Sequence, residues 1–88
     1  MSILKVSIRQ LKAARALKGW SQADLAKHAG VSLPTIKRLE AADGSDIGGR
    51  ADTTEAIVNA LTANGVIFVD ENGEGPGVRL RKVRAADR

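Results

Sequence analysis

The sequence contains no cysteine and no tyrosine, and it has only one tryptophan and one phenylalanine. Without cysteine, neither disulfide bonds nor thiolate metal sites can form, which is compatible with a reducing compartment. The longest aliphatic and aromatic run, Val66 to Val69, is far shorter than the roughly 18 residues of a membrane-spanning helix. No signal-like apolar stretch opens the chain. We therefore expect a soluble cytoplasmic protein with no membrane partner and a core of Leu, Ile, Val and Ala.

At 88 residues, the chain is shorter than a typical domain of roughly 100 to 200 residues, so a single domain is expected. Its charge is unevenly distributed. Residues 1–50 carry nine Lys and Arg against four Asp and Glu, residues 51–77 carry none against five, and residues 78–88 carry five against one. A polyanion would meet a basic first half and a basic tail. Scattered charge is also typical of solvated helix surfaces, so charge alone does not identify the partner.

Three short helices are predicted in the first half of the chain, each preceded by a serine that can cap it. Gly19 and Gly30 are natural ends for the first two helices. Pro34 is tolerated in the first turn of the third, where its missing N–H would have no helical partner. Apolar residues recur at helical spacing within each segment. The capping pairs are Ser7 with Gln10 and Ser21 with Asp24, Ser32 caps the third helix, and the predicted helices cover residues 8–18, 22–29 and 33–41.

The remainder of the chain passes from loop to helix to strand patterning. Residues 42–52 are predicted to form a loop, because their three glycines and three aspartates favour turns. A fourth helix is expected to open at Asp52-x-x-Glu55 and to close at Asn64-Gly65. β-branched and alternating residues then predict a β-hairpin with a seven-residue loop. The first strand, the loop and the second strand cover residues 66–69, 71–77 and 78–81.

Residues 22–41 have the pattern of a helix-turn-helix, in which one short helix lies across DNA and the next enters the major groove. Gly30 permits the tight left-handed turn, and Ala26 allows the two helices to approach closely. The residues expected where the helices meet are all apolar: Leu25, Ala29, Val31, Ile36 and Leu39. The run from Gln22 to Glu40 resembles the DNA-binding domain of the Cro/CI-type (XRE-like) helix-turn-helix regulators. Arg15 and the Gly19-Trp20-Ser21 turn resemble the preceding helix of that family.

The resemblance covers about residues 8–64 and implies a fold. We expect a mainly α protein, a lambda-repressor-like four-helix helix-turn-helix domain with a C-terminal β-hairpin. The family usually continues with a fifth helix, so the hairpin has no counterpart in the resemblance. The single domain, residues 1–88, is divided into a helix-turn-helix bundle at 7–64, a hairpin at 66–83 and a basic tail at 84–88.

The resemblance also implies which residues contact DNA. Gln22, the first residue of the second helix, corresponds to a glutamine that often touches a phosphate and braces the recognition helix. Arg38 can bond guanine O6 and N7 together, and Lys37 can offer a charge to guanine or phosphate. Leu33 and Pro34 depart from the polar residues that many relatives carry there, and they can contact only a thymine methyl group. The residues implied in DNA binding are Gln22, Ser32, Leu33, Pro34, Thr35, Lys37 and Arg38.

Several of these residues have simpler interpretations. Ser32 can cap the third helix instead of binding a phosphate. Without the surrounding motif, Lys37 and Arg38 would be read as solvated helix charges. Trp20 is expected to wedge between the first two helices rather than to stack on a base, because it lies in the turn between them. His28 has no second ligand at metal-binding spacing, so we expect it to face solvent.

An ion pair between Arg15 and Glu40 is expected to join the first helix to the end of the third, as the matching positions do in the resembling family. Arg15 interrupts a small, apolar stretch of the first helix. A charge in such a place needs a partner.

No catalytic or cofactor-binding set is apparent. The run Asp70-x-Asn72-x-Glu74-Gly75 imitates the start of an EF-hand loop, but Arg81 occupies the position of the bidentate glutamate and no helix follows. The chain has no cysteine, no paired histidine and no carboxylate pair in a recognisable cleft. We therefore expect no enzyme, no metal and no other cofactor.

The predicted hairpin needs a further surface, because an isolated two-stranded hairpin is marginal in water. Val66 and Phe68 point to one face of the first strand and Ile67 and Val69 to the other, so both faces are apolar and only one can lie on the helices. Ile3-Leu4-Lys5-Val6, a second copy of the hairpin, or both must cover the rest. We favour the second copy, since recognition helices about 34 Å apart need a two-fold link. The residues expected in this dimer contact are Val66, Phe68, Val78 and Leu80.

These observations predict a sequence-specific double-stranded DNA-binding transcription regulator. Its recognition helix, about residues 33–41, would enter the major groove of a roughly palindromic site as part of a homodimer. The alternative is a small helix-turn-helix protein that acts mainly through another protein, like an antitoxin or an antiactivator. Leu33, Pro34 or the hairpin would then contact that partner.

Overall fold

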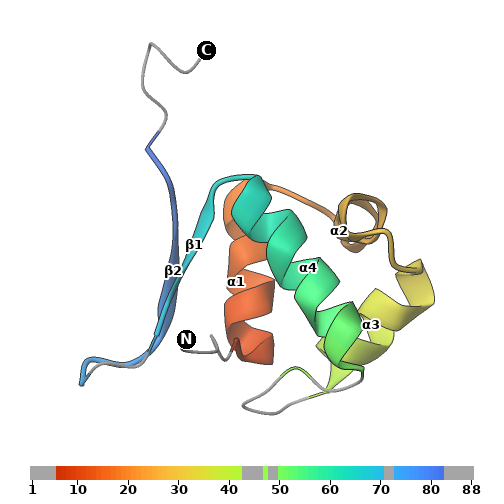
Figure 1. Cartoon of the computed structure of the whole chain (residues 1–88), viewed down its shortest axis with the longest axis horizontal. Coiled ribbons are helices and arrows are strands. Elements are labelled where there is room, and N and C mark those ends of the chain that lie inside the picture. Colours follow the sequence, from red (N-terminus) through yellow and green to blue (C-terminus); the bar gives the residue numbers. More distant parts are fainter. Residues whose placement is uncertain (1–5, 43–46, 48–49, 71–72, 83–88) are drawn as a thin grey trace.

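The computed structural model describes residues 6–42, 47, 50–70 and 73–82. The described chain forms four helices followed by a two-stranded antiparallel hairpin (Figure 1). The elements are α1 (Ile8–Lys18), α2 (Gln22–Ala29), α3 (Leu33–Ala41), α4 (Ala51–Ala63), β1 (Val66–Val69) and β2 (Gly77–Leu80). The predicted fold class and the predicted bounds of the first three helices are confirmed.

The capping pairs of α1 and α2 explain why these short helices begin where they do. The backbone N–H of Ser7 donates to the Gln10 side chain at 2.9 Å, and the Gln10 N–H donates to the Ser7 hydroxyl at 3.1 Å. Ser21 and Asp24 repeat this exchange at 2.9 and 3.0 Å. Each box satisfies backbone donors that a helix N-terminus otherwise leaves without a partner. At the other ends, Gly19 and Gly30 adopt left-handed φ angles of 70° and 69°.

The start of α4 differs from the prediction. The helix begins at Ala51, and Arg50 occupies the N-cap position without a side-chain capping bond. Asp52, which was expected to open the helix, lies inside its first turn, where its carboxylate accepts the Thr53 N–H at 2.9 Å and pairs with Arg50 at 3.3 Å. A carboxylate in the first turn is stabilised by the positive end of the helix dipole without being the cap.

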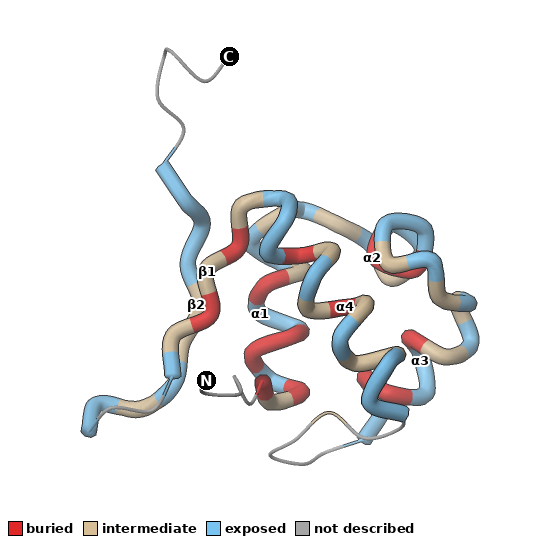
Figure 2. Tube along the Cα trace, viewed as in Figure 1, coloured by how far each residue is buried: buried red, intermediate tan, exposed pale blue. Residues whose placement is uncertain are grey.

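The core lies between the four helices and one face of the hairpin. Figure 2 shows that the buried segments of α1, α4 and β1 face the interior of the bundle. Ile47, from the segment between α3 and α4, packs against this core, and its N–H donates to the Val6 carbonyl at 3.3 Å. Removing these apolar groups from water is the main contribution to folding. The core residues with no measurable exposure are Leu11, Ala14, Leu25, Ile36, Ile57 and Leu61.

The hairpin packs against α1 and α4, on the opposite side of the molecule from α2 and α3 (Figure 1). Its register pairs Val66 with Leu80 and Val69 with Gly77, so β2 begins one residue earlier than predicted. The Gln10 side chain of α1 holds the end of this ladder that lies next to the turn. Its amide donates to the carbonyls of Val69 at 3.3 Å and Gly77 at 3.0 Å.

This packing corrects the predicted dimer contact. Val66 and Phe68 are only 2% and 9% exposed, because they belong to the core of this chain. Val78, opposite Phe68, also packs against that core, while Leu80 remains 41% exposed. The first helix and the fourth provide the surface that the hairpin needs, so Val66 and Phe68 have no surface to offer to a second copy.

Candidate nucleic-acid interface

The α2–α3 pair has the geometry of a helix-turn-helix. Gly30 ends α2 in the left-handed conformation, and the next N–H, from Val31, donates back to the Ala26 carbonyl at 3.0 Å. Only glycine adopts this conformation without steric cost, so the tight turn depends on Gly30. The apolar residues predicted at the helix junction are buried or half-buried against the core: Leu25, Ala29, Val31, Ile36 and Leu39.

The residues of α3 that are predicted to contact bases differ in how far their side chains are exposed. The side chains of Pro34, Lys37 and Arg38 are exposed. Leu33 is half-buried and packs against the core, so much of its apolar surface is already covered. Thr35 is half-buried as well. The two basic side chains are therefore the groups best placed for charge-assisted bonds to bases or phosphates.

Ser32 caps α3, one of its two expected roles. Its hydroxyl accepts the Thr35 N–H at 3.3 Å and lies 2.8 Å from the Thr35 hydroxyl. One hydroxyl thus anchors the start of α3 and orients its first polar side chain.

A buried polar cluster fixes α3 relative to α1 and α2. Arg15 binds Glu40 in a bidentate ion pair, with Nε to Oε2 and Nη2 to Oε1 distances of 2.9 Å each. The Glu40 side chain is 3% exposed, so this pair is largely removed from water. Arg15 also donates to the Trp20 carbonyl at 2.9 Å, and the Gln22 amide donates to Glu40 Oε1 at 3.1 Å. Every group in the cluster has a partner, which the burial of charge requires.

Gln22 therefore has a structural role in addition to any contact with DNA. It begins α2 and reaches the end of α3, so it braces the recognition helix as the resemblance implied. Its second implied role, contact with a phosphate, stays a prediction.

Trp20 and His28 form a stacked pair that was not expected from the sequence. Their ring centroids lie 4.1 Å apart and the rings are within 1° of parallel, while Lys18 Nζ lies 5.4 Å from the tryptophan ring. Trp20 is half-buried against the core and His28 is exposed. The left-handed turn at Gly19 and the helical rise of α2 bring the two rings together, and no local sequence pattern encodes that pairing.

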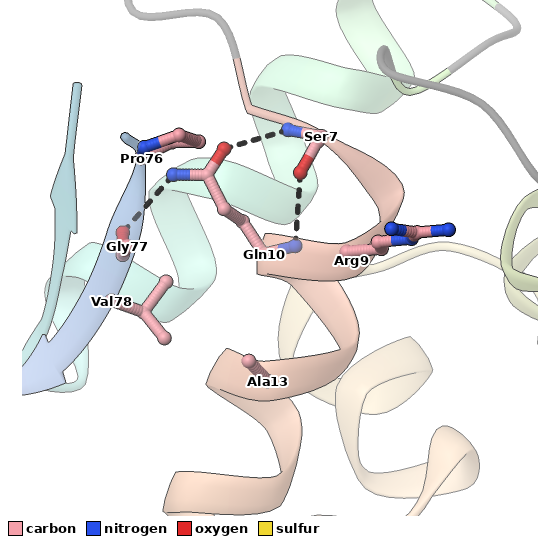
Figure 3. Close-up of a pocket in the computed structure, with 7 residues that line it drawn as sticks. All are labelled: Ser7, Arg9, Gln10, Ala13, Pro76, Gly77 and Val78. Atoms are coloured by element: carbon pink, nitrogen blue, oxygen red, sulfur yellow. Dashed lines mark hydrogen bonds between the residues drawn. The ribbon is translucent and has the colours of Figure 1, made fainter. Parts of the chain in front are cut away.

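A shallow pocket of about 280 Å³ lies away from α3, between the start of α1 and β2. Figure 3 shows the Gln10 side chain at its edge, reaching from the Ser7 N–H to the Gly77 carbonyl. The amide of Gln10 is thus occupied by the hairpin and by its own helix cap. The pocket is lined by Ser7, Arg9, Gln10, Ala13, Pro76, Gly77 and Val78.

The two short helices, the glycine turn and the exposed basic face of α3 define a helix-turn-helix protein. Residues 9–66 match the model of the Helix-turn-helix domain family. The chain belongs to this family, whose domains bind DNA and are typically not enzymes. The match runs from the second residue of α1 to the first residue of β1, so the hairpin beyond Val66 lies outside it.

A comparison with curated proteins found no match. Among the residues that the structure describes, no helix has the length and apolar character needed to cross a membrane. Within the same residues, no group of three or more histidine, aspartate and glutamate side chains is arranged to hold a metal ion.

Proposed function

We propose that the protein is a sequence-specific double-stranded DNA-binding transcription regulator of the Cro/CI (XRE-like) type, acting in the cytoplasm as a homodimer. The observation that carries this proposal is the exposed basic face of α3, with Lys37 and Arg38, on a helix fixed to α1 and α2 through the buried Glu40. A rigidly held helix of this kind can enter the major groove and present the same side chains to the same bases each time. No catalytic step is part of the proposal.

Arg38 is proposed to read guanine, since its planar guanidinium can donate to O6 and N7 together. Lys37 is proposed to contribute a phosphate or guanine contact, and Pro34 an apolar contact to a thymine methyl group. Ser32 and Thr35, which bond to each other at the start of α3, contribute more to the position of the helix than to base reading. Gln22 is proposed to add one phosphate contact at the start of α2.

Selection from random duplex DNA at a fixed salt concentration tests this function. Enrichment of one sequence with two-fold symmetry is expected, because a two-fold dimer presents α3 to two equivalent half-sites about 34 Å apart. The same experiment with Lys37→Ala and Arg38→Ala together is expected to lose the enrichment. Failure of the unaltered chain to enrich any duplex would refute sequence-specific binding.

A second candidate, action mainly through another protein, is favoured by one observation: Pro34 places an exposed apolar ring on α3 where a polar base-reading residue would be expected. Salt separates the two candidates. Binding through phosphates weakens by a slope of about 0.9 per contacted phosphate on a double logarithmic plot, whereas an apolar protein interface changes little.

A further inference from the structure

The hairpin presents an apolar outer face that does not take part in the core. Val66 and Phe68 fill the inner face, so Ile67 and Val69, which alternate with them, point away from α1 and α4. Both outer residues are half-buried, but neither belongs to the core cluster or to the apolar residues packed against it among the described residues. We call the surface made by Ile67, Val69 and the β2 residues opposite them the outer face.

The outer face has a flat, open position at Gly77. Antiparallel pairing places Gly77 opposite Val69 and Arg79 opposite Ile67, and opposite residues share a face. A Cβ added at Gly77 would meet no atom within 4 Å, and the backbone there does not adopt a left-handed conformation. Open space therefore lies over Gly77, between the side chains of Val69 and Arg79.

The two ends of the hairpin carry opposite charges. Asp70 and Glu74 are exposed at the turn, whereas Arg81 and Lys82 are exposed at the other end of the ladder. A two-fold axis perpendicular to the strands reverses the hairpin, so it places the acidic end of one copy beside the basic end of the other. The hairpin is thus complementary in charge to itself, which favours a second copy of this chain over an unrelated partner.

We propose that the outer faces of two copies pack against each other about such an axis, with β1 of each copy over β1 of the other and the open space at Gly77 inside the contact. This inference rests on the homodimer of the proposed function and names the surface that forms it. It replaces the contact first expected from Val66 and Phe68, which the core has already buried. Ile67 and Val69 supply the apolar part of this contact, and Arg79 lies beside them on the same face. The opposite charges at the two ends form the rim, where polar groups are usual in a protein interface.

Gly77→Val is the sharpest test, because it adds a side chain where this chain leaves open space and the backbone accepts one. In the full chain, light scattering over a concentration series should show a dimer for the unaltered protein. Overpacking at the contact should raise the dissociation constant of the Gly77→Val dimer by about 5- to 150-fold. Its melting temperature at a concentration where both proteins are monomeric should match that of the parent.

Two further variants provide the controls. Leu80→Gln removes an exposed leucine from the opposite face of the same hairpin, and it should leave the dimer intact. Arg81→Glu should weaken the dimer severalfold, and adding Glu74→Arg should restore it, since the two charges exchange places in both copies. A monomeric parent, or a Gly77→Val dimer as tight as the parent dimer, would overturn the proposed surface.

The binding of duplex DNA separates this inference from the proposed function. Gly77→Val should still bind a single half-site, because α3 lies on the other side of the molecule (Figure 1). If the parent enriches a duplex but the outer-face variants are as dimeric as the parent in light scattering, only the proposed dimer surface is wrong. If the variants become monomeric while no duplex is enriched by the parent, the surface stands and the DNA-binding function is wrong.

Discussion

At the scale of single residues, Glu40 carries a charge into the interior between α1 and α3. Its carboxylate is held by Arg15 on both oxygens and by the Gln22 amide on one. The Arg15 side chain is 23% exposed and the Glu40 side chain only 3%, so losing its partner would cost Glu40 more hydration than it would cost Arg15. The arginine could turn toward water, whereas the carboxylate could not.

We therefore expect Arg15→Ala to destabilise the fold more than Glu40→Ala does, with losses of about 3–5 kcal/mol for breaking such a pair. Arg15→Met combined with Glu40→Leu should lose much less, because neither charge is then stranded. Urea unfolding of the four proteins measures these free energies. Single variants as stable as the parent would show that the pair contributes nothing to the fold.

Asp24 links the capping of α2 to pH. The backbone N–H of Ser21, and then its hydroxyl, stabilise the Asp24 carboxylate and hold the pKa of this group below its usual range. Because the folded pKa is lowered, the contribution to stability is complete above the unfolded pKa and is lost as the pH falls through the folded value. Asp24→Asn should therefore lower the melting temperature at pH 7, and the difference from the parent should shrink below about pH 4. A difference that is constant across this range would exclude the carboxylate as its cause.

At the scale of elements, the basic residues of α3 are expected to contact DNA differently from those of α1 and α2. Arg38 projects from the recognition helix, whereas Lys12 and Lys27 are exposed on α1 and α2. Arg38→Ala should relax the preference at one base position and cost about 1–3 kcal/mol, while Lys12→Ala or Lys27→Ala should weaken all duplexes more evenly. Competition binding with single-base variants of the selected site measures both effects. An unchanged preference in the Arg38 variant would remove it from base reading.

The Gln10 amide adds hydrogen bonds to the packing of the hairpin against α1. Gln10 is 6% exposed, and its amide donates to the carbonyls of Val69 and Gly77. Removing this side chain takes a hydrogen-bond donor away from both carbonyls. Gln10→Ala should cost about 1–3 kcal/mol. Hydrogen exchange should speed up in β1 and β2 more than in α2 and α3. Lys12→Ala, an exposed change on the same helix, serves as the control, and equal acceleration in all elements would argue against a local attachment.

The ends of α1, α2 and α3 were predictable because their signals are local. The Ser7 hydroxyl accepts a hydrogen bond from Gln10, only three residues away. Gly30 ends α2 through its own left-handed φ angle, which depends on no distant residue. Contacts between distant segments were not predictable. Gln10 reaches carbonyls 59 and 67 residues further along the chain, and the inward face of β1 was known only once the helices were in place. The sequence indicated that Arg15 needs a partner, but Glu40 was identified as that partner only through the family resemblance.

At the scale of the whole molecule, the hairpin belongs to the fold as much as to any dimer. The family match ends at residue 66, yet the chain closes its core with Val66 and Phe68, which lie over α4 and α1. Burying two side chains of this size contributes roughly 3–6 kcal/mol. Small domains have a total stability of only about 5–15 kcal/mol, so this contribution is a large share.

Deleting residues 66–88 should therefore unfold much of the population rather than yield a stable monomer. Circular dichroism should show a melting temperature well below that of the parent, and Val66→Ala with Phe68→Ala should reproduce most of the loss in the full-length chain through the cavities they leave. Ile67→Ser, on the outer face, should melt like the parent under conditions where both are monomeric, because that side chain is outside the core. A deletion variant that melts like the parent would show that the four helices are sufficient, and that the hairpin adds only a surface.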